Sequence, residues 1–149
     1  MARKPVNLGH TGYQIIMATF ESKTTINRPV SDIYQFLADF NNHGQLMPDN
    51  VQNWAASYNE AGFMVQNTIK LSLQITERVE NKVVNITAIN NPPFPVQLNW
   101  LLEAQGGSTN VTFTINTEPS GLMKMMVSAP LQKLANHEVE SLRSVLNRD

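Results

Sequence analysis

The sequence SGLMKMMVSAPLQKLANHEVESLRSVLNRD, which spans Ser120 to Asp149, follows a long region in which apolar and polar positions alternate. From Leu131 onward the apolar residues recur at steps of three and four, so they form one stripe along an α-helix. The stripe consists of Leu131, Leu134, Ala135, Val139, Leu142, Val145 and Leu146. A helix with one long apolar stripe needs a broad apolar surface beneath it, and only the preceding strands offer one. The sequence therefore predicts a sheet curled around a C-terminal helix.

The first part of this helix contains a proline and a cluster of methionines. Pro130 lacks an N–H and has a fixed φ, so it either kinks one continuous helix or begins a second one with Ser128 as its N-cap. The preceding segment, Gly121 to Val127, holds three of the seven Met residues. Methionine side chains fill irregular gaps in a core and also form adaptable binding surfaces, and both roles remain open here.

Glu138 lies in the middle of the apolar stripe. A carboxylate in that position pairs with a buried partner, extends to solvent, or faces a polar pocket. A structural pair is the simplest of these outcomes and the one that we expect. A polar pocket is the outcome that would matter for function.

Composition limits the class of protein. With 149 residues, of which 42% are hydrophobic, the chain fits one domain with a proper core. A net charge of −1 and only 15% charged residues argue against nucleic-acid binding. The absence of cysteine excludes disulfides, thiolate metal sites and Cys nucleophiles. The three histidines, His10, His43 and His137, have no metal-ligand spacing, so we expect neither a metal nor a cofactor.

The N-terminal residues 1–14 contain Pro5, Gly9 and Gly12 and show no periodicity, so we expect a loose leader before a single domain of residues 15–149. The apolar run Ile15–Ala18 is too short for a signal-peptide core or a membrane span. We therefore expect no integral membrane segment and a cytoplasmic location. Nothing in the sequence indicates an oligomeric state.

The body of the chain predicts one strand, two short helices and then a strand meander. The first strand runs from Ile16 to Ile26 and ends at Asn27–Pro29, and short helical segments follow in Val30–Asp39 and Phe40–Asn50. About six further strands are expected: Val51–Tyr58, Phe63–Asn67 leading on to Ile69–Thr76, Val83–Asn90, Val96–Ala104 and Val111–Ile115. Because every connection is short, the sheet must be antiparallel.

The opening of this region resembles a known family. The residues FESKTTINRPV (Phe20–Val30) and IYQFLAD (Ile33–Asp39) resemble the start of the START-like (SRPBCC) superfamily, in which I-x-x-P-x-x-x-V/I-W/Y-x-x-L-x-D joins the first strand to the first helix. The likeness covers Ile16 to Asp149 and is greatest to the polyketide cyclase/dehydrase-like branch. Many relatives carry a Trp before a Pro in the following loop, whereas this chain has Leu46-Met47-Pro48.

The resemblance implies an α+β helix-grip fold, with an antiparallel six- to seven-stranded sheet wrapped around the long C-terminal helix and two short helices after the first strand. It also implies an apolar cavity between sheet and helix for lipids, polyketides or similar molecules. We therefore expect binding or transport of a hydrophobic small molecule. The alternatives are a polyketide cyclase/dehydratase-type enzyme that uses polar cavity residues, and a protein-interaction module of the same fold.

The sequence contains no strong catalytic motif, so an acid or base would have to come from scattered residues. The candidates are Glu138, Tyr58 and His43. His43 lies in a polar loop beside the expected cavity mouth, where solvent exposure is the simplest expectation. Tyr58 shares a side of its strand with Trp54, but the pattern does not decide whether that side or the opposite one faces inward.

The expected walls of the cavity are the large apolar residues of the inward strand faces, the loop before the second strand and the Met-rich segment. They are Met47, Trp54, Phe63, Leu73, Phe94, Leu98, Trp100, Met123, Met126 and Val127.

Overall fold

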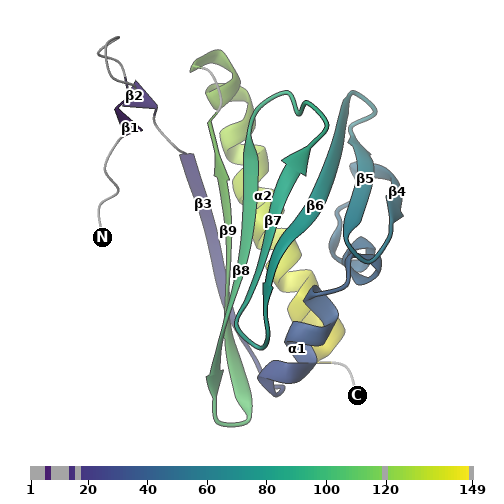
Figure 1. Ribbon diagram of the computed structural model, residues 1–149, viewed down its shortest axis with the longest axis vertical. Coiled ribbons are helices and arrows are strands. Elements are labelled where there is room, and N and C mark those ends of the chain that lie inside the picture. Colours follow the sequence, from purple (N-terminus) through teal and green to yellow (C-terminus); the bar gives the residue numbers. More distant parts are fainter. Residues whose placement is uncertain (1–5, 8–13, 16–17, 119–120, 148–149) are drawn as a thin grey trace.

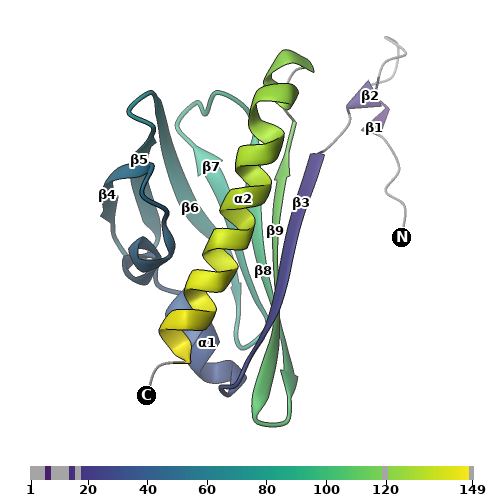
Figure 2. The same cartoon turned by 180° about the vertical axis from the view of Figure 1, so that it is seen from behind.

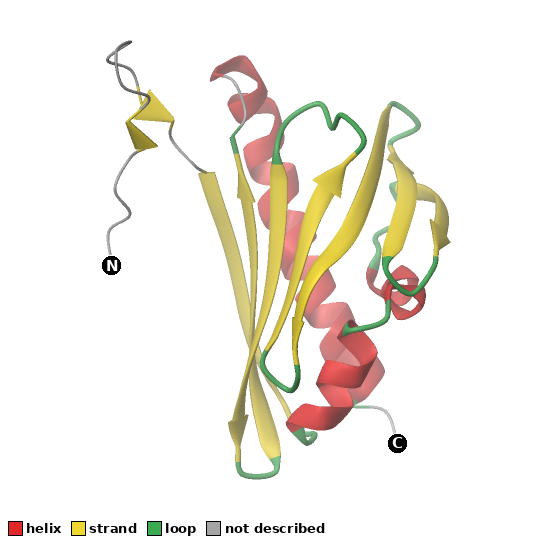
Figure 3. Ribbon diagram, viewed as in Figure 1, coloured by secondary structure: helices red, strands yellow, loops and turns green. Residues whose placement is uncertain are grey.

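The computed structural model describes residues 6–7, 14–15, 18–118 and 121–147, with the backbone alone for 6–7, 14–15 and 121–129. A seven-stranded antiparallel sheet curls around one long helix, α2 (Gly121–Leu146), which lies across its concave face (Figures 1 and 2). The other helical segments are α1 (Val30–Leu37) and the 3-10 helix η1 (Phe40–Leu46). The predicted helix-grip α+β architecture is confirmed (Figure 3).

The sheet has the strand order β3-β9-β8-β7-β6-β5-β4. The strands are β3 (Ala18–Ile26), β4 (Val51–Ala56), β5 (Glu60–Val65), β6 (Ile69–Val79), β7 (Val83–Ile89), β8 (Val96–Gln105) and β9 (Ser108–Thr117). Strands β4 to β9 form a meander of neighbours, as the short connections predict, and β3 pairs with β9 at the far edge. Asn81 and Gly106, in the β6–β7 and β8–β9 turns, have positive φ, a conformation that Asn and Gly adopt at low cost.

The register places matching apolar residues side by side across the sheet. Phe20 pairs with Ile115, which pairs with Leu98, which pairs in turn with Ile86. Because side chains alternate along a strand, these residues and those two positions away share the face toward α2, called the inward face below. The outward face carries mostly polar and charged residues, with Thr, Asn and Gln the most frequent.

Helix α2 runs through Pro130 without interruption. The alternative of a second helix that begins there with Ser128 as its cap is therefore wrong. Pro130 is exposed, so its ring projects into solvent, and the apolar stripe that follows it keeps the helix on the sheet. Among the described residues, no helix is long and apolar enough to cross a membrane.

The N-terminal region contains a feature that the sequence pattern did not predict. Two-residue strands, β1 (Val6–Asn7) and β2 (Gln14–Ile15), pair in antiparallel fashion to form a separate small sheet. Strands of two residues are too short to produce a recognisable alternation, so periodicity cannot reveal them.

Candidate functional site

The interior between the sheet and α2 is packed unevenly. At the end covered by α1, here called the closed end, five inward residues are at most 2% exposed: Ile26, Val84, Leu102, Val111 and Leu142. Toward the start of α2, here called the open end, several inward apolar residues are only partly buried: Phe20, Leu71, Ala88, Leu98, Leu131 and Leu134. The burial is graded, since Ile115 is fully enclosed although it lies beside Phe20 and Leu98. A group of partly buried apolar side chains therefore lies on the inward face at the open end.

A continuous row of aromatic rings crosses the interior from the β4–β5 hairpin to the centre of the sheet. In order, this aromatic row consists of Phe63, Trp54, Phe40, His43, Trp100 and Phe113. The rings of Phe63 and Trp54 stack with centroids 5.4 Å apart, and those of Trp100 and Phe113 stack at 4.1 Å. The central contacts are edge-to-face, at centroid distances from 4.8 to 6.5 Å. Both arrangements are favourable for aromatic quadrupoles.

The orientation of Trp54, which the sequence left open, follows from a β-bulge. The register of β4 shifts between Gln52 and Ala55, and Asn53 adopts a φ of 58°. This turns Trp54 inward, where its indole lies against Gly44 of η1. A Cβ on Gly44 would lie 3.0 Å from the indole ring, so a larger residue there would require the indole to shift.

Tyr58 does not share this inward orientation. It lies beyond the end of β4, its side chain is 51% exposed, and the guanidinium of Arg78 lies 4.1 Å from its ring centroid. The sequence left open which side of this strand faces inward; Trp54 faces inward but Tyr58 does not, because the strand ends at Ala56 before its alternation reaches Tyr58.

His43 is 1% exposed, so the expectation of a solvent-exposed loop residue is also wrong. The turn of η1 folds the loop back and inserts the ring between Phe40 and Trp100. Its Nε2–H donates to the carbonyl oxygen of Leu37 at 2.8 Å, which leaves Nδ1 as an acceptor. Burial lowers the pKa of His43 to about 4, against the opposing effects of that hydrogen bond and of Asp39. The imidazole is therefore neutral at pH 7.

Glu138 is the one acid enclosed in the interior among the described residues. It lies on the buried face of α2 with Ala135, Val139 and Leu142, and it is 3% exposed. No donor or cation in the described part of the chain reaches its carboxyl group, so the expected structural pair is wrong. Burial alone raises the pKa of Glu138 from 4.5 to about 8. At pH 7 this carboxyl group ionises in the unfolded chain, where its pKa is 4.5, but stays protonated in the folded state. Because a tenfold change in an ionisation equilibrium corresponds to about 1.4 kcal/mol, the difference lowers the free energy of unfolding at pH 7 by about 3 kcal/mol.

Trp100 carries a second interior polar group without a protein partner. Its indole Nε1–H is buried, and no acceptor among the described residues lies within hydrogen-bond distance. A buried donor that lacks an acceptor costs about 1–3 kcal/mol. The described residues therefore leave both this donor and the Glu138 carboxyl group without a hydrogen-bond partner.

The structure does not bring the three catalytic candidates together. Tyr58 is outside, and no described hydrogen bond joins His43 to Glu138. The residues that the structure describes contain no group of three or more His, Asp and Glu side chains that could hold a metal ion. His137 lies on the exposed side of α2, as the helical wheel predicts.

The predicted wall residues occupy several environments. Trp54, Met47 and Leu98 are partly buried, while Phe63, Leu73, Phe94 and Trp100 are buried. The side chains of Met123, Met126 and Val127 lie outside the described residues, and the cavity wall as a whole stays a prediction. The sequence reasoning missed Phe20, Phe40 and Phe113, although the alternation of β3 and β9 already placed Phe20 with Ile26 and Phe113 with Ile115.

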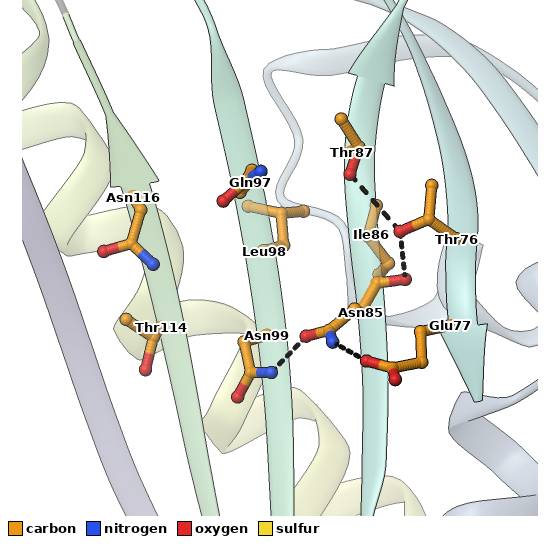
Figure 4. Close-up of a pocket in the computed structure, with 10 residues that line it drawn as sticks. All are labelled: Thr76, Glu77, Asn85, Ile86, Thr87, Gln97, Leu98, Asn99, Thr114 and Asn116. Carbon is orange, nitrogen blue, oxygen red and sulfur yellow. Dashed lines mark hydrogen bonds between the residues drawn. The ribbon is translucent and has the colours of Figure 1, made fainter. Parts of the chain in front are cut away.

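The outward face of the sheet carries a shallow polar hollow of about 390 Å³ (Figure 4). Asn99 donates a side-chain hydrogen bond to Asn85, and Asn85 donates one to Glu77. Thr76 and Thr87 join through their hydroxyl groups. A neighbouring hollow of about 470 Å³ lies beside the β7–β8 loop. The larger side chains that would form an apolar pocket point to the other face of the sheet.

Comparison with known proteins identifies the fold. No protein-family profile matches the chain, and no curated protein matches it in sequence. The Zhui aromatase/cyclase from a Streptomyces species superposes with a TM-score of 0.69 at 12% identity, over 89% of this chain and 95% of that one. A START superfamily protein from Mycobacterium smegmatis gives 0.65 at 12%, over 86% and 96%.

Norcoclaurine synthase from Thalictrum flavum superposes with a TM-score of 0.69 at 7% identity, over 99% of this chain and 100% of that one. Identities this low establish a common architecture and nothing finer. Together with the curled sheet, the enclosed C-terminal helix and the two short helical segments, they show that this protein has a START-like helix-grip fold, the architecture shared by the START superfamily protein and the aromatase/cyclase above.

Proposed function

We propose that the protein binds a hydrophobic small molecule, such as a lipid or a polyketide-like compound, between the inward face of the sheet and α2. The observation that carries this proposal is the contrast between the two ends of the interior. At the closed end Ile26, Val111 and Leu142 are fully enclosed, whereas at the open end several apolar residues that point inward, Leu98 among them, remain partly exposed. A ligand seated at the open end would cover this apolar surface.

The energetics of such a ligand are adequate. Burial of apolar area contributes about 25 cal/mol per Å², and part of this is lost to the entropy of association. A drug-sized ligand would therefore reach micromolar affinity. Two of the structural neighbours are named as an aromatase/cyclase and as norcoclaurine synthase, which supports a small organic molecule as the class of ligand.

Binding is better supported than catalysis. An enzyme of the cyclase or dehydratase type would need polar groups that converge on one reacting atom. Of the candidates, Tyr58 lies on the outside and His43 is held by Leu37. Glu138 alone could act on a ligand in the interior, and one acid can orient a ligand without any reaction.

The proposal is tested by native mass spectrometry of the purified protein, followed by organic extraction of anything that it retains. We expect a hydrophobic molecule that is released on denaturation, or, for a protein purified empty, saturable binding of the neutral dye N-phenyl-naphthylamine with enhanced fluorescence. Absence of both would overturn the proposal.

A matched pair of variants locates the site. Leu98→Trp places a larger ring on the inward face of β8 at the open end, and it should reduce dye binding strongly. Leu101→Trp makes the same change on the outward face of the same strand, and it should leave dye binding unchanged. Equal effects of the two variants would place the dye elsewhere.

A further inference from the structure

Glu138 is the starting point, because its position has no structural explanation. The side chain projects from the middle of the buried face of α2, is only 3% exposed, and has neither a hydrogen bond nor an ion pair in the described part of the chain. A buried carboxyl group without a partner is unfavourable whether it is charged or neutral. Such a group fits a site whose partner arrives with a ligand.

The charged groups that surround the interior are already engaged. Arg78 shares the face of β6 that points inward, but its guanidinium donates to the carbonyl oxygens of Ala38 and Tyr58 at 2.8 and 3.0 Å. Asp32 of α1 pairs with Arg28, at 3.6 Å between Nη1 and Oδ2. Next to η1, the Asp39 carboxylate accepts from the backbone N–H of Asn41.

The remaining inward positions provide no cation. His43, on η1, is buried and neutral, and its one donor is bonded to Leu37. The inward faces of β3, β9, β8 and β7 carry only apolar residues, Ser and Thr. In the described residues, the protein itself therefore offers no positive charge to Glu138.

We propose, as an extension of the proposed function and resting on it, that the ligand is a hydrophobic amine whose ammonium group pairs with the Glu138 carboxylate. A ligand with only a neutral acceptor would be served equally well by a Gln or Thr, without the cost of an ionisable group. The acid indicates that charge is what the site recognises.

The binding step balances as an exchange of one proton. In the empty protein the Glu138 carboxyl group holds its proton at pH 7, whereas a free alkylamine is protonated in water. On binding, the carboxyl proton leaves to solvent and the carboxylate pairs with the ammonium. Close to one proton should therefore be released per ligand at pH 7. Below about pH 8, the affinity for the amine should rise about tenfold with each unit increase in pH. Above about pH 8 the affinity should be constant, until the amine itself deprotonates.

The test compares three competitors with the same ring system: naphthylethylamine, naphthylethanol and naphthylacetic acid. Each displaces N-phenyl-naphthylamine from the full-length protein at pH 7, and proton release is measured by calorimetry in buffers of different ionisation enthalpy. We expect the amine to bind at least about tenfold more tightly than the alcohol, and the acid to bind most weakly.

Two variants separate this inference from a general effect of charge. Glu138→Gln keeps the size and the hydrogen-bonding capacity of the side chain but cannot ionise, so the amine should lose its advantage while the alcohol binds as before. Glu140→Gln removes an exposed acid, two residues along α2, and should change neither competitor. Circular dichroism and the melting temperature of each variant verify that it is folded.

The outcomes distinguish the two proposals. If the dye binds but the alcohol equals the amine, or if Glu138→Gln retains the preference for the amine, the amine inference is wrong and the binding site stands. If the affinity for the amine falls between pH 6 and pH 8, the inference is also overturned. If the wild-type protein binds neither the dye nor any competitor, the proposed function fails, and the inference fails with it.

Discussion

The two ends of the interior use the same kinds of residue and differ in how completely those residues are covered. At the closed end, α1 and the last turns of α2 enclose the inward face, so that Ile26 and Leu142 are fully buried. At the open end, Phe20 of β3 and Leu98 of β8, which flank Ile115 of β9 on the inward face, remain partly exposed. The difference comes from what covers the sheet, because the strands themselves continue with the same alternation throughout.

This contrast explains how one small domain can be stable and still retain binding surface. Close packing is the main source of stability in a protein interior, and it can be concentrated in one region. Ile26, Val84, Val111 and Leu142 at the closed end are fully buried. The open end is therefore free to keep apolar surface that a ligand can cover.

The largest effect should come from the closed end. Leu142→Ala removes a fully enclosed side chain and should lower the free energy of unfolding by about 2–5 kcal/mol. Leu134→Ala, on the same helix but only partly buried, should cost clearly less. Urea denaturation of both variants measures the difference, and equal losses would contradict the division of the interior into two ends.

The next effect concerns the unpaired acid. Glu138→Met should stabilise the empty protein by about 3 kcal/mol at pH 7, because the folded state no longer holds a carboxyl group protonated against its ordinary pKa. Because the pKa of Glu138 is raised in the folded state, the wild-type protein loses stability as the pH rises from 4.5 to about 8. The stability gained by Glu138→Met should therefore grow over that window. Denaturant midpoints across the window measure it.

His43 has the opposite pH dependence, which determines where the Glu138 effect is measured best. The pKa of His43 is lowered from 6.5 to about 4 in the folded state, because burial disfavours the charged imidazolium. Its contribution to stability is therefore present above pH 6.5 and is lost as the pH falls from 6.5 to about 4. Of these two residues, only Glu138 changes the stability of the protein with pH between pH 6.5 and pH 8. A wild-type stability that does not fall with pH in this interval would show that Glu138 has a partner.

A smaller effect is expected at the contact between η1 and β4. Gly44→Ala places a methyl group 3.0 Å from the Trp54 indole, which must shift, and this should cost about 1–2 kcal/mol. The tryptophan emission spectrum should change with it. Unchanged emission and stability would mean that Trp54 has room to move, as expected if it borders empty space.

The smallest effect should come from the open end itself. Leu98→Ala truncates a partly exposed side chain and should cost about 1 kcal/mol or less, since little packing is lost. It should nevertheless weaken binding of N-phenyl-naphthylamine. A loss of stability as large as that of Leu142→Ala would show that the open end is packed as tightly as the closed end.

The architecture could be predicted from the sequence alone, because fold depends on periodic patterns that are local. The two-residue alternation from β3 to β9, the short connections and the three-to-four spacing from Leu131 predict an antiparallel sheet around a helix. These patterns also placed Glu138 on the buried face of that helix and His137 on the exposed one. The opening residues Phe20–Asp39 predicted the particular helix-grip arrangement that the comparisons show.

The environment of the individual side chains became clear only from the folded chain. The bulge at Asn53 turned Trp54 inward, the short η1 helix buried His43 beside Trp100, and Tyr58 fell beyond the end of its strand. Burial and partnership depend on contacts between residues far apart in the chain, which no local pattern records. The pattern places Glu138 on the buried face of α2 but cannot show what lies opposite its carboxyl group. Only the folded chain shows that the described residues provide no partner for it.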